Sequence, residues 1–157
     1  KEIMNEGANV KGNPLRISVY LLIASYVIGE FFLPKYPIAY AVKLVGIICF
    51  LVSIAIFFAG FNIFKTYDEN PVPTSATNKN IKTGIFAYTR NPIYLSFVIF
   101  HLSMFFIFEN VMYFLSAIGL AIWLHNYVIK EEENFLSEQF SDEYENYKRT
   151  VKRWIFF

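Results

Sequence analysis

Apolar residues gather in four long runs along this chain, separated by polar segments. The runs cover Leu15 to Leu33, about Leu44 to Phe64, Ile93 to Phe108 and Val111 to Ile129. A helix needs about 20 apolar residues to cross a bilayer, within a range of roughly 17–25. The pattern therefore predicts an all-α integral membrane protein with about four transmembrane helices. No small-residue cleavage site follows the first run, so we expect a membrane helix there and not a signal peptide.

The polar segments between the runs predict how the helices are connected. A long stretch rich in Thr, Asn and Pro, residues 65–91, separates the second run from the third. Only Glu109 and Asn110 separate the third run from the fourth. Such a short connection is typical of a helical hairpin. The third and fourth helices are therefore predicted to be antiparallel neighbours.

The chain changes character after Ile129, where the sequence becomes KEEENFLSEQFSDEYENYKRTVKRWIFF. Apolar residues recur there at steps of three or four, as in an amphipathic helix; they are Leu136, Phe140, Tyr144, Tyr147, Val151 and Trp154. We expect Ser141 to cap a second helical segment within this tail. The apolar stripe either lies on lipid headgroups as an interfacial helix or covers a site on the protein.

Composition supports the membrane assignment and excludes one class of partner. The chain is 55% hydrophobic and 20% aromatic, with a net charge of +1. That charge argues against a nucleic-acid-binding surface, which needs a concentrated basic patch. The single cysteine, Cys49, lies in an apolar run and is expected to be a small core residue. We expect one domain over residues 1–157 and no metal site.

Lysine and arginine positions predict the orientation in the membrane. With four crossings, the N-terminus, the middle loop and the tail share one side, which holds twelve of these residues, against Lys35 and Lys43 on the other. Cytoplasmic segments carry the excess of positive charge. Both termini and the middle loop are therefore expected in the cytoplasm, and a prokaryotic cytoplasmic membrane is the expected location.

Candidate chemistry begins with Arg90, which stands just before the third apolar run. Asn91 and Pro92 suit a helix start, since Asn caps helices and Pro fits the first helical position. Arg90 is thus expected beside the positive end of a helix, where an anion such as a carboxylate binds favourably. The alternative is that Arg90 extends to a lipid phosphate.

A second group of polar residues lies at the end of the fourth run, at the same cytoplasmic level. His125 and Asn126 fall in the last turns of that helix, and Glu132 and Glu133 follow. His125 and Glu132 are seven residues apart, so they are predicted to share a helix face. Ionisable groups at a membrane helix usually face the protein interior or a cavity. One cation and two carboxylates suit a zwitterionic, cationic ligand; the alternative is a solvated acidic turn.

These segments resemble a known family. TGIFAYTRNPIYL, followed after a hydrophobic hairpin by HNYVIKEEENFLSEQFSDEYENYKRTVKRW, is similar to the isoprenylcysteine carboxyl methyltransferases and their phospholipid methyltransferase relatives over about residues 60 to 155. The family's Arg-His/Asn-Pro-x-Tyr motif falls on Arg90, Asn91, Pro92 and Tyr94, and its Glu-Glu-x-x-Leu motif falls on Glu132, Glu133 and Leu136. Further matches are His125, Phe140, Tyr144 and Arg153.

Some positions depart from the eukaryotic members of the family. Asn91 stands where those enzymes have His, and the chain ends with Trp-Ile-Phe-Phe and not with their Ile-Pro. Both features resemble the small prokaryotic branch. Ser141 stands where the family often has Gly after the late Phe.

The resemblance implies an S-adenosylmethionine site within about residues 83–155. Arg90 would pair with the cofactor's carboxylate in a charge-assisted fork, and Glu132 or Glu133 would receive its ammonium. Tyr88, Tyr94 and Tyr127 are candidates to stack on adenine or face the sulfonium. The remaining pocket residues are expected to be Asn91, Pro92, Leu95 and Asn126. Arg90, Glu132 and His125 are the catalytic candidates.

The expected reaction is methyl transfer to a lipophilic acceptor from the bilayer, with the third and fourth helices as walls of its path. A carboxylate acceptor needs no base, whereas an amine or hydroxyl needs one, for which His125 or a glutamate is a candidate. The competing hypothesis is a non-catalytic four-helix membrane protein that binds anionic lipid headgroups. The expected partners are thus a lipophilic substrate and membrane lipids.

Overall fold

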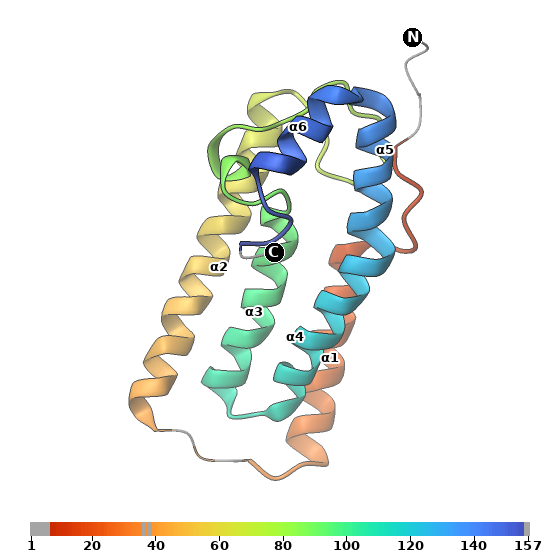
Figure 1. Cartoon of the computed structure of the whole chain (residues 1–157). Coiled ribbons are helices and arrows are strands. Elements are labelled where there is room, and N and C mark those ends of the chain that lie inside the picture. The colour runs from red at the N-terminus through yellow and green to blue at the C-terminus, as the bar shows by residue number, and fades with distance from the viewer. Residues whose placement is uncertain (1–6, 36, 38, 156–157) are drawn as a thin grey trace. The chain divides into compact units, whose positions relative to one another are not determined.

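The structure is a computed structural model that describes residues 7–35, 37 and 39–155. Every regular element in these ranges is a helix (Figure 1). The α-helices are α1 (Pro14–Phe31), α2 (Tyr40–Thr66), α3 (Pro92–Phe108), α4 (Val111–Leu124), α5 (Lys130–Phe140) and α6 (Asp142–Thr150). A 3-10 helix, η1, covers Gly84–Ala87, and a π-helix, η2, covers His125–Ile129.

The predicted all-α membrane fold is confirmed. Three helices are long and apolar enough to cross a bilayer: Pro14–Phe31, Tyr40–Thr66 and Val111–Phe140. The fourth apolar helix, α3, has 17 residues. Large apolar side chains on α1 and α2 are exposed, among them Phe31 and Ile48. Such exposure suits helices whose surroundings are lipid, where every backbone polar group must be bonded within the segment.

The helix that begins at Val111 differs from the sequence prediction at its C-terminal end. The apolar run predicts an end near Ile129, but the helix continues through η2 and α5 to Phe140, over 30 residues. Residues 130–139 contain no Gly or Pro, and several of them are good helix formers, so hydrophobicity ends at Ile129 while helix propensity does not. The change of composition marks a change of surroundings and not the end of a helix.

The chain divides into two compact units, each described by itself. The membrane unit comprises residues 12–55 and 94–124. The loop-and-tail unit comprises, among the described residues, 7–11, 56–93 and 125–155. In the membrane unit, α1 packs along α4.

Asn110 holds the predicted hairpin turn in place through hydrogen bonds to α4 and α1. Its Oδ1 accepts a hydrogen bond from the backbone N–H of Met112 at 2.9 Å, which caps the first turn of α4. Its Nδ2 donates to the carbonyl of Ser25 in α1 at 3.1 Å. A side chain at Gly29 would overlap Asn110, so glycine is required there for this close approach. The turn therefore ties the hairpin to α1.

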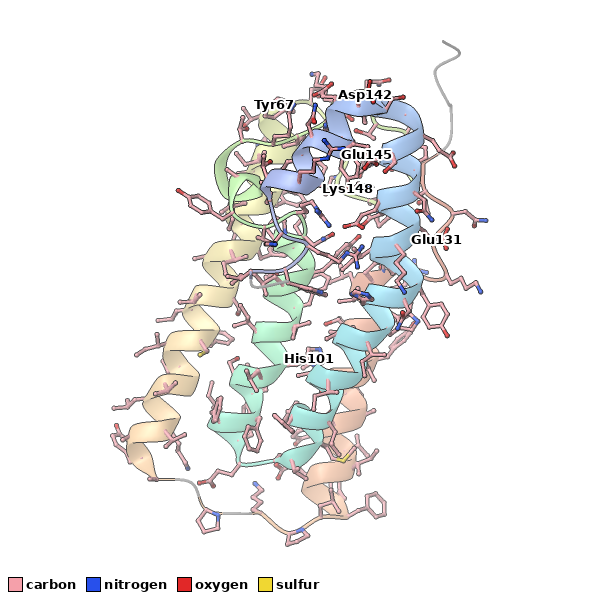
Figure 2. All side chains as sticks on the ribbon, in the orientation of Figure 1. Tyr67, His101, Glu131, Asp142, Glu145 and Lys148 are labelled. Atoms are coloured by element: carbon pink, nitrogen blue, oxygen red, sulfur yellow. The ribbon has the colours of Figure 1, made fainter. Side chains whose placement is uncertain are left out.

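His101 is fully buried in α3 and links three helices of the membrane unit (Figure 2). Ser116 of α4 donates its hydroxyl to the Tyr113 carbonyl, so it accepts from His101 Nδ1 at 2.7 Å. The other ring nitrogen, Nε2, then accepts from the hydroxyl of Ser18 in α1 at 3.0 Å. A neutral imidazole thereby has both nitrogens satisfied inside an apolar bundle.

The tail forms the predicted amphipathic helices, and its apolar stripe faces inward in the loop-and-tail unit. Tyr144, Tyr147 and Trp154 are all buried. Ser141 separates α5 from α6 with φ of 49°, and its side chain makes no capping hydrogen bond, contrary to prediction. A positive φ favours glycine.

We predict that His101→Ala lowers the free energy of unfolding by about 1–3 kcal/mol, because two interhelical hydrogen bonds of about 0.6–1.7 kcal/mol each are lost. Thermal and denaturant unfolding of the purified protein in detergent measures the change. Ser103→Ala is the matched control, since Ser103 is equally buried in α3 but bonds to the carbonyl of Phe100 in its own helix. Equal losses in the two variants would show that His101 does not stabilise the bundle across helices.

Candidate functional site

The candidate site is built around the start of α3, in the loop-and-tail unit. α3 begins at Pro92, as predicted, and this proline is almost completely buried. The residues just before it are tied to the tail. Arg90 N donates to the Lys152 carbonyl at 3.0 Å, and Thr89 Oγ1 and Asn91 Nδ2 both donate to the carbonyl of Arg153.

The Arg90 guanidinium is buried and held by three partners. Nη1 donates to the carbonyls of Lys148 and Val151 at 3.0 and 2.9 Å, and Nη2 donates to Glu133 Oε1 at 2.7 Å. The side chain is only 9% exposed, so the alternative of an arginine extended to lipid phosphate does not describe it. Nε is buried and donates no hydrogen bond within the described part of the chain.

Glu133 lies between two arginines. Its Oε1 also accepts from Arg153 Nε at 3.0 Å, and its Oε2 pairs with Arg153 Nη2. The hydrogen bond with Glu133 raises the pKa of Arg153 above its usual value, so this guanidinium stays charged. We call Arg90, Glu133 and Arg153 the arginine node. It carries two positive charges and one negative charge, so its three residues have a net charge of +1.

The π-helix η2 decides which glutamate joins this node. A π turn holds one more residue than an α turn, because its hydrogen bonds span five residues and not four. Residues eight apart across it therefore return to one face, as residues seven apart do in an α-helix. His125 Nε2 lies 3.3 Å from Arg153 Nη1, and Glu133, eight residues on, binds the same guanidinium. The predicted pairing of His125 with Glu132 on one face is therefore wrong.

Glu132 instead contributes to the wall of a cavity of about 100 Å³ in the same unit. Charged and aromatic side chains form much of the wall: Arg90, Glu132, Lys79, Phe64, Phe86, Phe135, Tyr144 and Tyr147. The rest comes from Ala8, Leu136 and residues between 70 and 81. Burial raises the pKa of Tyr144 and Tyr147, so both phenols stay neutral. Tyr147 donates to the carbonyl of Phe86 at 2.6 Å.

Several residues predicted for the site are not part of this cavity wall. Tyr88 is 79% exposed, and it does not line this cavity. Asn126 is exposed on η2 and accepts a hydrogen bond from Lys130. Tyr127 is half-exposed beneath the ammonium of Lys11. Tyr94 and Leu95 belong to the membrane unit, where Tyr94 is buried.

The cavity and the arginine node also contain residues that the sequence analysis did not assign to the site. Ala8 and residues 64–81 lie outside the predicted cofactor-binding part, and Arg153 was recognised only as a family match. The asparagines and prolines of the loop resemble any solvent-exposed connection, so they carry no signal by themselves. Tyr144 and Tyr147 were detectable, because the amphipathic stripe of the tail includes both.

An N-terminal strap, residues 7–11, closes one part of this cavity. Its backbone pairs with the loop: Gly7 N donates to the Thr74 carbonyl at 3.2 Å and Ala8 N to the Pro73 carbonyl at 3.0 Å. Ala8 is 3% exposed and lines the cavity. A side chain at Gly7 would overlap the carbonyl oxygen of Ser75. Glycine is thus needed for the strap to lie this close to the loop.

We predict that Gly7→Ala exposes the cavity. The reporter is Ile81→Cys, a buried lining position, in a Cys49→Ser background labelled with a maleimide. Loss of two backbone hydrogen bonds of about 0.5–1.5 kcal/mol each should raise the labelling rate about tenfold. Gly119→Ala is the control, because a methyl group there meets open space. Equal labelling rates with and without Gly7→Ala would mean that the strap does not control access.

Comparison with known proteins shows the family of this chain. The phospholipid methyltransferase family matches residues 38–143, more than half of the chain, a range that includes Arg90, Glu132 and Glu133. An uncharacterized protein of Haemophilus influenzae is 32% identical over 63 residues, which make up 40% of this chain and the whole of that protein. The resemblance noted in the sequence is thereby confirmed at the level of the family. This chain belongs to the phospholipid methyltransferase family of membrane methyltransferases.

Proposed function

We propose that this protein transfers a methyl group from S-adenosylmethionine to a lipophilic acceptor that reaches the site from the bilayer. The observation that carries the proposal is the arginine node beside a cavity whose wall contains Glu132, in a chain of a membrane methyltransferase family. Family membership supports methyl transfer to a lipid. The donor and the acceptor class are inferred from the chemistry of the residues present.

The charged groups of the site are complementary to the amino-acid end of S-adenosylmethionine. The three residues of the node have a net charge of +1, and Arg90 Nε is a buried donor without a described acceptor. These features suit the carboxylate, while Glu132 suits the ammonium. Nη1 of Arg90 gives both its N–H groups to tail carbonyls and Nη2 gives one of its two to Glu133, so Nε is the nitrogen of Arg90 that remains for the carboxylate.

The aromatic wall suits the other parts of the cofactor. The rings of Phe64 and Phe86 meet edge to face with centroids 5.5 Å apart, and the ring centroids of Tyr144 and Tyr147 are 5.8 Å apart. Such faces stack on adenine and attract a cationic sulfonium. The cavity of about 100 Å³ is smaller than the roughly 300–1,000 Å³ of usual ligand pockets. Binding therefore requires the loop or the strap to move outward.

The bound cofactor supplies an electrophilic methyl group, and the chain's own residues orient the reactants and exclude water. The tail and the loop enclose the cavity, which favours a reaction that disperses charge. Glu133 has both oxygens engaged by arginines, and His125 Nε2 faces Arg153. Neither suits the role of base. With Glu132 assigned to the cofactor's ammonium, a carboxylate acceptor, which needs no base, suits this site better than an amine or hydroxyl acceptor.

We predict that the purified protein binds S-adenosylmethionine and that Glu132→Gln weakens this binding about tenfold or more, since a charge-assisted hydrogen bond contributes about 1.5–3 kcal/mol. Isothermal titration calorimetry measures the affinity. Glu131→Gln is the matched control, because Glu131 is exposed on the same helix (Figure 2). Absence of binding by the intact protein would contradict the proposed function and favour a lipid-binding membrane protein.

For the acceptor, we predict that kcat/KM falls steeply when the acyl or prenyl chain is shortened. The physical reason is that a chain held in lipid raises the local concentration of acceptor, by about 0.8 kcal/mol for each buried CH₂. A series of acceptors with a constant reactive group and different chains, assayed in vesicles, measures this. Equal methylation of a chain-free, water-soluble acceptor would rule out delivery through the bilayer.

We also propose that both termini and the loop between α2 and α3 are cytoplasmic, from the twelve-to-two distribution of Lys and Arg. In a Cys49→Ser background, Lys79→Cys should be labelled from the cytoplasmic side only, and Lys35→Cys from the opposite side only. Labelling of both positions from one side would contradict four crossings.

A further inference from the structure

Two adjacent glutamates of α5 have different surroundings. Glu132 lines the cavity, whereas Glu133 is 7% exposed and is not part of the cavity wall. We propose that Glu133 is a positioning residue that holds the Arg90 guanidinium in place, and that Glu132 is the one of the two that contacts the ligand. The ligand part of this inference rests on the proposed function; the positioning of Arg90 does not.

Both carboxylate oxygens of Glu133 already accept hydrogen bonds from arginines. It accepts from Arg90 Nη2, Arg153 Nε and Arg153 Nη2, so both oxygens have charged donors. A ligand ammonium would have to displace an arginine from a buried ion pair. Breaking such a pair leaves an unpaired buried charge, which is strongly unfavourable. Glu133 therefore serves the protein's own cations.

Glu133 completes the set of contacts that orients Arg90. Two of these contacts are tail carbonyls, those of Lys148 and Val151, and both hold Nη1. Glu133 holds Nη2, the other end of the guanidinium. With both ends fixed, the plane of the group is determined, and Nε is the nitrogen not engaged in the node. Without Glu133, the group keeps its anchors at one end only.

The π-helix makes this division of roles possible. The extra residue in His125–Ile129 rotates the first turn of α5, so that Glu133 and not Glu132 faces Arg153 together with His125. Glu132 then faces the cavity in the company of Leu136, one turn further along α5. Identical side chains at neighbouring positions thus acquire different functions through the backbone alone.

The test compares Glu133→Gln with Glu132→Gln as a matched pair, with two measurements. The first needs no ligand: solvent exchange of the Arg90 Nε–H proton, followed by NMR on protein with labelled arginine, of which the chain has four. Glu133→Gln should accelerate this exchange about tenfold or more, as expected when a charge-assisted hydrogen bond is lost. Glu132→Gln should leave it unchanged. Unchanged exchange in Glu133→Gln, or equal acceleration in both, would overturn the inference.

The second measurement is the affinity for S-adenosylmethionine in the double variant Arg90→Gln/Glu133→Gln, compared with Arg90→Gln. If Glu133 acts only through Arg90, its replacement has no further cost once Arg90 is absent, so the double variant should bind no more than about threefold more weakly than Arg90→Gln. Glu132→Gln should still weaken binding about tenfold in the Arg90→Gln background, because Glu132 makes its own contact with the ligand. If Glu133→Gln alone does not fold, the comparison of these variants carries the test.

The two proposals fail in different ways. If the native protein binds no S-adenosylmethionine, the proposed function is wrong, and the exchange of Arg90 Nε–H still decides whether Glu133 positions the guanidinium. If the native protein binds the cofactor but Arg90→Gln/Glu133→Gln binds about tenfold more weakly than Arg90→Gln, Glu133 contacts the ligand directly and the inference is wrong.

Discussion

The buried carboxylate of Glu133 is the interaction on which the loop-and-tail unit depends. It joins three segments that are far apart in the sequence: the segment before α3, which holds Arg90, helix α5 and the tail. Removing ions from water costs several kcal/mol for each ion, and only good geometry and additional hydrogen bonds offset this cost. Here the carboxylate has three donors, and Arg90 gains two tail carbonyls as well. Together these contacts fasten the tail to the start of α3.

The cavity is a consequence of that arrangement. Tyr144 and Tyr147 can line it because the tail is held against residues 89–91. The loop adds its own contacts to the tail helices, through Gln139 with the Thr77 carbonyl and Lys82 with Glu143. The second of these pairs is exposed and contributes little stability. The covering layer is therefore held more weakly than the arginine node.

A few buried polar groups link the helices of the membrane unit. In lipid there is no hydrophobic driving force between helices, so close packing at small residues and interhelical hydrogen bonds contribute to association. His101 with two serines, and Asn110 against Gly29, provide both. These groups are buried among α1, α3 and α4, while the apolar exposed faces of α1 and α2 suit lipid.

The sequence by itself determined the helices, because length, hydrophobicity and local turn chemistry are properties of neighbouring residues. The four apolar runs, the start of α3 at Pro92 and the two-residue hairpin turn were all predictable. The family was recognisable for the same reason, since its motifs are short and continuous. The end of the helix that begins at Val111 was not predictable, because helix propensity continues beyond the hydrophobic run.

Only the tertiary structure decided which polar groups meet. Glu132 and Glu133 are indistinguishable in the sequence, and a regular α-helical period places Glu132 on the face of His125. The π turn places Glu133 there instead, and no residue pattern in the sequence predicts a π turn. Arg153 lies twenty residues from Glu133, and the strap pairs with a loop more than sixty residues away. Tyr88 belongs to the motif region, yet it is exposed. Such contacts depend on how distant segments pack, and packing is not encoded in any single local stretch of the chain.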